Sequence, residues 1–185
     1  MTTALLIGDG SSLDQWREYV IFNNFDYTIG TYCHLDEPDI DFDYYAIEKL
    51  DHCYFVNSLA PEQAQFCYTT GLNSQKTGIS NDCNGRIYHD TLYTLQMRIA
   101  LNLGATHIVT VAWDWMNLSA GVYESALYRT WKPVQQYRVD RSTWIERRKK
   151  LRANFGPVYK RFESIEHKGL RHHEVFGEHE NMVLR

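Results

Sequence analysis

Residues 90–114 read DTLYTLQMRIALNLGATHIVTVAWD, and they contain the clearest structural unit of the chain. Apolar side chains recur there at the spacing of one helix face, at Leu92, Leu95, Ile99, Ala100 and Leu103. Gly104 follows at the position where helices commonly end. Residues 107–112 are then mainly apolar, as in a strand that is buried on both faces. This stretch therefore predicts a helix and a strand of an α/β fold, with Asp114 directly after the strand.

The segments on either side continue the alternation of strands and helices. N-terminal to this unit, we expect strands at residues 4–7, 25–30 and 53–56 and helices at residues 12–23, 44–50 and 61–69. Residues 71–86 are rich in Gly, Asn, Ser and Asp, which is typical of a loop. C-terminal to the unit, we expect a basic helix at residues 143–168, kinked or split at Gly156-Pro157, and a last strand at residues 171–176. The predicted fold class is α/β, with a Rossmann-like, mainly parallel sheet and helices on both faces.

Size and composition indicate a single globular domain. The chain has 185 residues, with 13 Tyr, 8 Phe and 5 Trp. It shows no apolar run long enough for a membrane span and no signal-peptide pattern. The cysteines Cys33, Cys53, Cys67 and Cys83 form no C-x-x-C pair, so we expect free thiols in a reducing compartment. These features predict a cytoplasmic protein that does not contact a membrane.

Charge divides the chain into two regions. Residues 1–128, the expected core, carry a formal charge of −11, and residues 129–185 carry +7, which together give the net charge of −4. The basic region includes Arg147, Lys149 and Arg152 on the polar face of its predicted helix. Such a region can meet the phosphates of a nucleotide or of nucleic acid, or it can pack beside the acidic core. Both interpretations stay open at this point.

Polar residues follow three of the predicted strands. The turn Gly8-Asp9-Gly10-Ser11-Ser12 follows the first strand, Asn57 and Ser58 follow residues 53–56, and Asp114 follows residues 107–112. Ligands of open parallel sheets bind at the carboxyl ends of the strands, so we expect these residues to line one pocket.

The turn after the first strand fits either a ligand or a helix cap. Gly8 and Gly10 allow close backbone approach, amides at a helix start favour anions, and Ser11 and Ser12 add hydroxyl donors. The turn lacks the third glycine of G-x-G-x-x-G and the lysine of a Walker A loop. Asp9 would repel a phosphate but can accept a hydrogen bond from a base amino group or a ribose hydroxyl. The alternative is an ordinary turn in which Ser11 or Ser12 caps the next helix.

Several residues are candidates for catalysis. Asp114, between two tryptophans, can bind a ribose, orient a histidine or act as a base, or it can simply cap a turn. A histidine can act as a general base at neutral pH, and the candidates are His34, His89, His172 and His173. Any one of them can instead have a structural role.

The acidic segment from Asp39 to Asp43 contains D-x-D twice. Such carboxylates can hold Mg²⁺ or Mn²⁺ against a diphosphate, although the same pattern is common in acidic surface loops. We therefore predict no required cofactor, with a divalent cation as the alternative.

These motifs together resemble those of the family 42 sialyltransferases and the related 6-hydroxymethylpterin pyrophosphokinase-like proteins. Members open with a strand and a G-x-G-P-S-L turn, and residues 8–13 read GDGSSL. Their third strand ends in an asparagine turn, similar to residues 55–59, FVNSL. They then carry a helix that ends in A-x-x-L-G, an apolar strand and G-x-D, similar to ALNLG at residues 100–104 and AWD at residues 112–114.

The resemblance implies a nucleotide or nucleotide-sugar site and a sugar transfer. The turn at Gly8, Asp9, Gly10, Ser11 and Ser12 would hold the nucleotide, Asn57 and Asp114 would line the pocket, and Thr91 would begin the helix that approaches it. Asp9 replaces an asparagine of the family, and Ala112 replaces a glycine. We therefore expect a nucleotide-sugar-dependent glycosyltransferase. The alternative is a non-catalytic accessory module that binds a nucleotide or nucleic acid.

Overall fold

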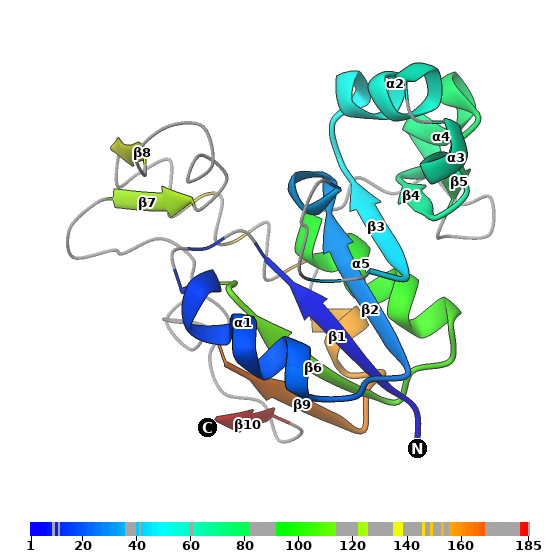
Figure 1. The fold of residues 1–185 in the computed structure, drawn as a ribbon. Helices are drawn as coiled ribbons and strands as arrows, with labels where there is room; N and C mark the ends of the chain where they lie inside the picture. Colours follow the sequence, from blue (N-terminus) through cyan, green and yellow to red (C-terminus); the bar gives the residue numbers. More distant parts are fainter. Residues whose placement is uncertain are drawn as a thin grey trace.

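The computed structural model describes residues 1–8, 10, 12–35, 40, 42–59, 61–81, 92–113, 122–125, 135–138, 146, 149, 153, 156–168 and 182–184. Within this part of the chain, an eight-stranded sheet is the central layer (Figure 1). Its strands are β1 (Thr3–Ile7), β2 (Tyr27–Thr31), β3 (Tyr44–Ile47), β4 (Cys67–Thr69), β5 (Ser80–Asn81), β6 (His107–Val111), β9 (Ser164–His167) and β10 (Met182–Leu184). Every neighbouring pair runs parallel, which confirms the predicted α/β fold with a parallel sheet.

The order of the strands reverses beside β1. The sheet runs β10-β9-β6-β1-β2-β3-β4-β5, so the chain builds outward from β1 to β5 and then crosses back to β6 on the other side of β1. From β6 it continues outward to β9 and β10. After β1 the chain therefore continues to one side of the sheet, and after the neighbouring strand β6 it continues to the other side. In open parallel sheets, a crevice forms between two loops that diverge in this way.

Helices cover both faces of the sheet. α1 (Leu13–Phe22) lies on one face and α5 (Leu92–Asn102) on the other (Figure 1). Successive residues of β1 alternate between the two cores, because Leu5 and Ile7 pack in the core that contains α1 residues, and Ala4 and Leu6 pack with α5. Both cores exclude water from the strand, which explains why residues 4–7 of β1 are all apolar rather than alternating.

Five predicted elements around the centre of the sheet are confirmed. The strands β1, β2 and β6 and the helices α1 and α5 lie within one or two residues of the expected ranges. Gly104 ends α5 with a φ of +82°, a left-handed conformation that glycine adopts without a Cβ clash.

The region between β2 and α5 differs from the prediction. Residues 44–47, expected as part of a helix, form the strand β3 between β2 and β4. Residues 53–56, expected as a strand, lie inside the helix α2 (Leu50–Leu59). Cys53 and Val56 are one helical turn apart and are both buried in a third core with Ile47. Burial of this pair on one side of a helix explains why a short apolar run is not a strand.

Further differences follow along the chain. Residues 61–69 divide into α3 (Pro61–Ala64) and β4, and the expected loop at residues 71–86 contains α4 (Gly71–Thr77) and β5. A separate antiparallel pair joins β7 (Val122–Ser125) to β8 (Gln135–Arg138).

The basic C-terminal region contributes strands as well as helix. Its described residues are helical at 146, 149, 153 and 156–159, but β9 then begins where the helix was expected to continue to residue 168. Ile165 and His167 are buried while Ser164 and Glu166 are less so, which is the period of a strand. The sheet therefore draws β9 and β10 from this region and is not confined to residues 1–128. The strand expected at residues 171–176 lies outside the described residues.

Candidate functional site

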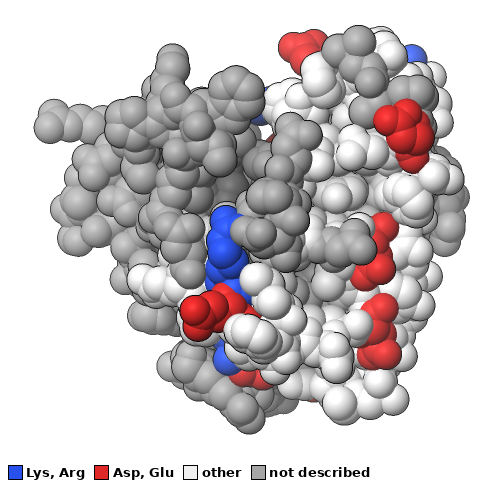
Figure 2. Space-filling view, in the orientation of Figure 1, with Lys and Arg blue, Asp and Glu red and all other residues white. Residues whose placement is uncertain are grey.

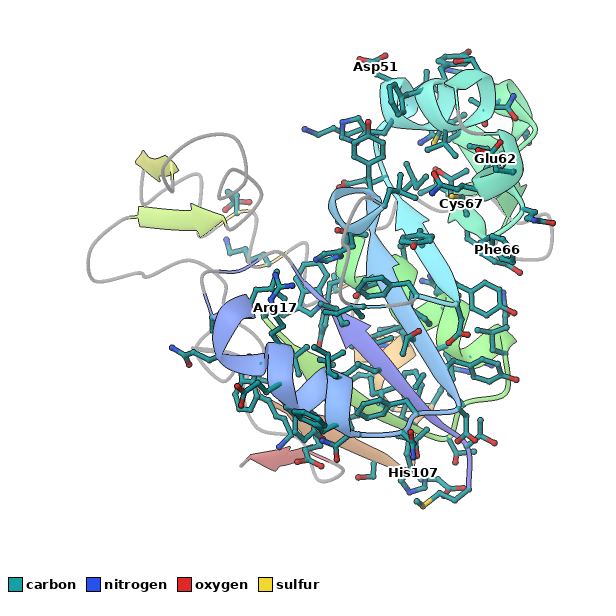
Figure 3. All side chains as sticks on the ribbon, in the orientation of Figure 1. Arg17, Asp51, Glu62, Phe66, Cys67 and His107 are labelled. Atoms are coloured by element: carbon teal, nitrogen blue, oxygen red, sulfur yellow. The ribbon has the colours of Figure 1, made fainter. Side chains whose placement is uncertain are left out.

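The carboxyl ends of β1, β2 and β6 meet at the point where the strand order reverses. Figure 3 places Arg17 of α1 beside the chain that leaves β1, and His107, the first residue of β6, at the opposite end of the sheet. The candidate site is therefore built from the residues that directly follow these three strands, together with the first turns of α1 and α5.

The loops after β1 and β6 are joined by backbone hydrogen bonds. The N–H of Gly8 donates to the carbonyl of Val111 at 2.9 Å, and the N–H of Gly10 donates to the carbonyl of Ala112 at 2.7 Å. A Cβ on Gly8 would lie 2.6 Å from the Ala112 oxygen. Gly8 is thus required by the close approach of the neighbouring loop. Both glycine amides already have backbone acceptors.

Ser12 precedes α1 at the N-cap position but does not cap the helix through its side chain. Its side chain is buried, and its carbonyl accepts the N–H of Gln15 at 2.9 Å. The predicted capping hydroxyl is therefore not seen at Ser12. The helix starts instead with a backbone turn, in which Leu13 donates to the carbonyl of Gly10 at 3.1 Å.

Ala112 has a φ of +56°, and it is the one non-glycine residue with positive φ among the residues described. A side chain in this left-handed region costs about 1–2 kcal/mol, because Cβ crowds the following carbonyl. Strain of this kind persists where surrounding contacts fix the backbone and is common at ligand sites. Here the carbonyl of Ala112 holds Gly10, and the strain occurs directly at the reversal of the strand order.

Gln96 joins the ends of all three strands, and the sequence analysis did not select it. Its Nε2 lies 2.9 Å from the carbonyl of Ile7, 3.0 Å from that of Ile29 and 3.1 Å from that of Gly30. Its Oε1 accepts the indole N–H of Trp113 at 2.9 Å. The side chain is 0% exposed, so each of these polar groups is satisfied without water. A glutamine on the otherwise apolar face of the predicted helix was the available signal.

His34 lies at the carboxyl end of β2, in the 3₁₀ turn η1 (Tyr32–His34), and is 3% exposed. The backbone N–H of Thr31 donates to its Nδ1 at 2.9 Å, so the neutral ring carries its hydrogen on Nε2. Nε2 has no hydrogen-bond partner within the described part of the chain. The ring also stacks on Phe42, with centroids 5.2 Å apart.

The environment of His34 keeps the ring neutral. The pKa of His34 is lowered to about 4, mainly because burial disfavours the charged ring, and the positive charge of Arg17 acts in the same direction. A backbone hydrogen bond of the ring with Gly8 acts in the opposite direction, so the Gly8 backbone lies close to the ring although Nε2 makes no hydrogen bond of good geometry. At neutral pH the ring is a buried hydrogen-bond donor, and the lone pair on Nδ1 is already occupied. This arrangement suits donation to a ligand oxygen and does not suit the general base that the sequence suggested for His34.

A positive charge lies near this site. Figure 2 shows a small patch of basic side-chain atoms near the centre of the face in view, where Figure 3 places Arg17, with acidic atoms directly beside it and further acidic side chains along the side over β2 and β3. A cationic side chain at the carboxyl ends of β1 and β2 favours an anionic ligand.

Asn57 and Ser58 do not belong to this site. Both lie near the end of α2, where Asn57 Nδ2 donates to the carbonyl of Thr77 at 3.1 Å and Ser58 Oγ donates to that of Tyr54 at 2.8 Å. Asn57 joins α2 to the end of α4, and Ser58 bonds within its own helix. The expectation that they follow a strand and line the pocket with Gly8 is wrong, because residues 53–56 are helical. Residues 55–59 therefore do not form the asparagine turn at a strand end to which the sequence analysis compared them.

The remaining predicted site residues lie outside the described residues. They are Asp9, Ser11, His89, Thr91, Asp114, His172 and His173. Their predicted roles stay predictions.

The described residues contain no group of three or more His, Cys, Asp or Glu side chains that could hold a metal ion. Of the acidic D-x-D segment, Asp43 accepts hydrogen bonds from the N–H and the hydroxyl of Thr28, at 2.7 Å and 2.8 Å. This carboxylate fixes the start of β3 to the start of β2, at the end of the sheet away from the candidate site. Asp39 and Asp41 lie outside the described residues.

The helices that the structure describes are all too short or too polar to cross a bilayer. Comparison with known proteins adds no relative: no protein-family model, no curated protein and no solved structure matches the chain.

Proposed function

We propose that the chain binds a nucleotide at the carboxyl ends of β1 and β6 in a Rossmann-like arrangement. We further propose that it transfers the sugar of a nucleotide sugar to an acceptor hydroxyl. The observation that carries the proposal is the reversal of strand order between β1 and β6. There the loops after both strands are interlocked, and Ala112 is held at positive φ.

The side chains around this point fit an anionic ligand with hydroxyl groups. The neutral His34 ring offers its Nε2–H to a ligand oxygen, and Arg17 supplies a positive charge for a phosphate. The N–H groups of Gly8 and Gly10 already donate to carbonyls of Val111 and Ala112, so we expect side chains rather than these amides to bind the phosphate.

The transfer step follows the chemistry of glycosyl transfer in general. The acceptor oxygen attacks the anomeric carbon as the bond from that carbon to the phosphate oxygen breaks, and the nucleotide leaves with the electron pair. A base takes the proton of the acceptor hydroxyl. Asp114, which follows β6 in the sequence, is our candidate for this base, and His34 is not, because its Nδ1 accepts the N–H of Thr31.

Calorimetric titration with CMP, UDP, GDP and their sugar conjugates tests the binding. We expect at least one of them to bind below about millimolar, and Arg17→Gln to weaken it roughly tenfold or more, the effect of losing one charged hydrogen bond. Lys76→Gln is the matched control, since it removes a positive charge from the exposed end of α4. Absence of binding by wild-type protein would exclude the proposed function.

Asp114→Asn separates the transfer from the binding. We expect this variant to bind the nucleotide sugar with unchanged affinity and to lose turnover with acceptor. Unchanged turnover would mean that another residue is the base. Loss of binding would mean that Asp114 contacts the ligand.

A further inference from the structure

Three aromatic side chains form a cluster beside the candidate site. The rings of Tyr32 and His52 stack with centroids 3.8 Å apart and planes 14° apart. Phe55 meets the Tyr32 ring edge-on, with centroids 5.9 Å apart and planes at 84°. Tyr32 belongs to η1, and the other two residues belong to α2, so the cluster joins the end of β2 to the helix after β3.

One member of the cluster, Phe55, is exposed to solvent to about the same extent as Tyr54 and Phe66. The side chain of Phe55 is 45% exposed, and Tyr32 and His52 are half-buried. The exposed ring of Phe55 adjoins the two half-buried rings, so the three together present an aromatic surface to solvent.

The cluster lies within reach of the candidate site. Tyr32 and His34 are two residues apart in one turn, so their Cα atoms are separated by no more than about 7 Å. His34 offers its buried Nε2–H at the ends of β1 and β2, and Tyr32 begins the aromatic cluster next to it.

From this juxtaposition we infer that Tyr32, His52 and Phe55 form the platform on which the base of the bound nucleotide stacks. The inference rests on the proposed function, because it assigns one part of the same ligand. Every nucleobase presents a flat π-face, and aromatic side chains stack on it without needing a particular sequence of donors and acceptors. Burial also lowers the pKa of His52, with Lys49 acting in the same direction and Asp51 in the opposite one, so at neutral pH the imidazole adds an aromatic face rather than a charge.

The test compares a ligand that has a base with one that lacks it. Wild-type protein and Phe55→Ala are each titrated by calorimetry with two ligands. One is whichever of CMP, UDP and GDP binds most tightly, and the other is ribose 5-phosphate, which has no base. We expect Phe55→Ala to weaken the nucleotide about tenfold and to leave ribose 5-phosphate unchanged, since stacking supplies about one to two powers of ten per base. Phe66→Ala is the matched control, because Phe66 is 44% exposed but lies on the connection between α3 and β4.

A second measurement keeps the inference testable if a variant folds poorly. In wild-type protein, the imidazole proton resonances of His52 are expected to shift with nucleotide and not with ribose 5-phosphate, because only a stacked base adds a ring current. If Phe55→Ala binds the nucleotide as tightly as wild-type protein does, and the His52 resonances do not shift, the base does not stack on this cluster. The proposed function would then still stand, because the nucleotide binds. Equal weakening of both probes would also overturn the platform. Failure of wild-type protein to bind any nucleotide would overturn both the platform and the proposed function.

Discussion

The indole N–H of Trp113 donates to Oε1 of Gln96 at 2.9 Å, and this bond ties the end of β6 to α5. The Nε2 of the same glutamine contacts carbonyls at the ends of β1 and β2. One buried side chain thus fixes the relative positions of the three strand ends that surround the candidate site. Its two N–H hydrogens are shared among these three carbonyls.

Replacing this glutamine should loosen the site and destabilise the fold. Gln96→Leu keeps the approximate volume but leaves the Trp113 N–H and the strand-end carbonyls without their partner. We expect the free energy of unfolding to fall by about 2–4 kcal/mol, as measured by urea denaturation. Met97→Leu, a buried and volume-conserving change on the same helix, should cost less than about 1.5 kcal/mol. Equal effects of the two changes would contradict the role given to Gln96.

The backbone strain at Ala112 can be measured as the gain in the free energy of unfolding when the residue is replaced by glycine. Ala112→Gly removes the Cβ that is unfavourable at a φ of +56°, so we expect thermal or urea unfolding to show a gain of up to about 1 kcal/mol. Ala100→Gly is the comparison, because Ala100 lies in the buried interior of α5, where glycine costs about 1 kcal/mol. A loss of stability in Ala112→Gly would mean that the positive φ is not strained.

The close approach of the two loops predicts a strong effect at Gly8. Gly8→Ala places a methyl group 2.6 Å from the backbone oxygen of Ala112, and neither loop can yield without breaking their hydrogen bonds. We expect a loss of at least about 2 kcal/mol. Gly156→Ala has open space around the added methyl group and lies in a helix, so it should stabilise the protein by about 0.5–1 kcal/mol. Tolerance of Gly8→Ala in the same assay would show that the loops separate easily.

His34 should make stability depend on pH in acid. Its pKa is about 4 in the folded protein and 6.5 in the unfolded chain, so between these values the unfolded chain binds the extra proton. Stability is therefore full above pH 6.5 and falls as the pH is lowered toward 4, by on the order of 3 kcal/mol.

Urea unfolding at pH 7.5 and pH 4.5 measures this loss. His34→Asn keeps an acceptor for the Thr31 N–H but does not titrate, so its stability should fall less than that of wild-type protein over the same interval. His107→Asn, at the opposite end of the sheet, serves as the control and should retain the wild-type loss. The account of His34 fails if wild-type protein and His34→Asn lose the same amount.

The parts of the fold that the sequence predicts are those whose apolar pattern is long and regular. α5 has three turns with apolar residues at helical spacing and a glycine stop, and β1 and β6 are buried on both faces, so local pattern and tertiary packing agree. The apolar run at residues 53–56 has only four residues, which is too few to distinguish the repeat of a strand from the repeat of a helix. Packing of Cys53 and Val56 on one side of α2 makes it helical.

The candidate site is predicted only in part, for a related reason. The reversal of strand order depends on which strands pair, and pairing is a long-range property that no local motif contains. The close approach at Gly8 was expected to serve a ligand, yet its neighbour is the backbone of Ala112. Gln96 was visible as a polar residue on an apolar helix face, and such a residue needs partners when buried.

Chemical-shift mapping of backbone amides during a nucleotide titration tests the central claim most directly. With CMP, UDP or GDP, the account predicts that the largest shifts occur at Gly8, Thr31 and Ala112, and that Asp26 and Thr106 at the opposite end of the sheet do not respond. Shifts centred elsewhere, or none at millimolar nucleotide, would contradict a nucleotide site at the ends of β1 and β6.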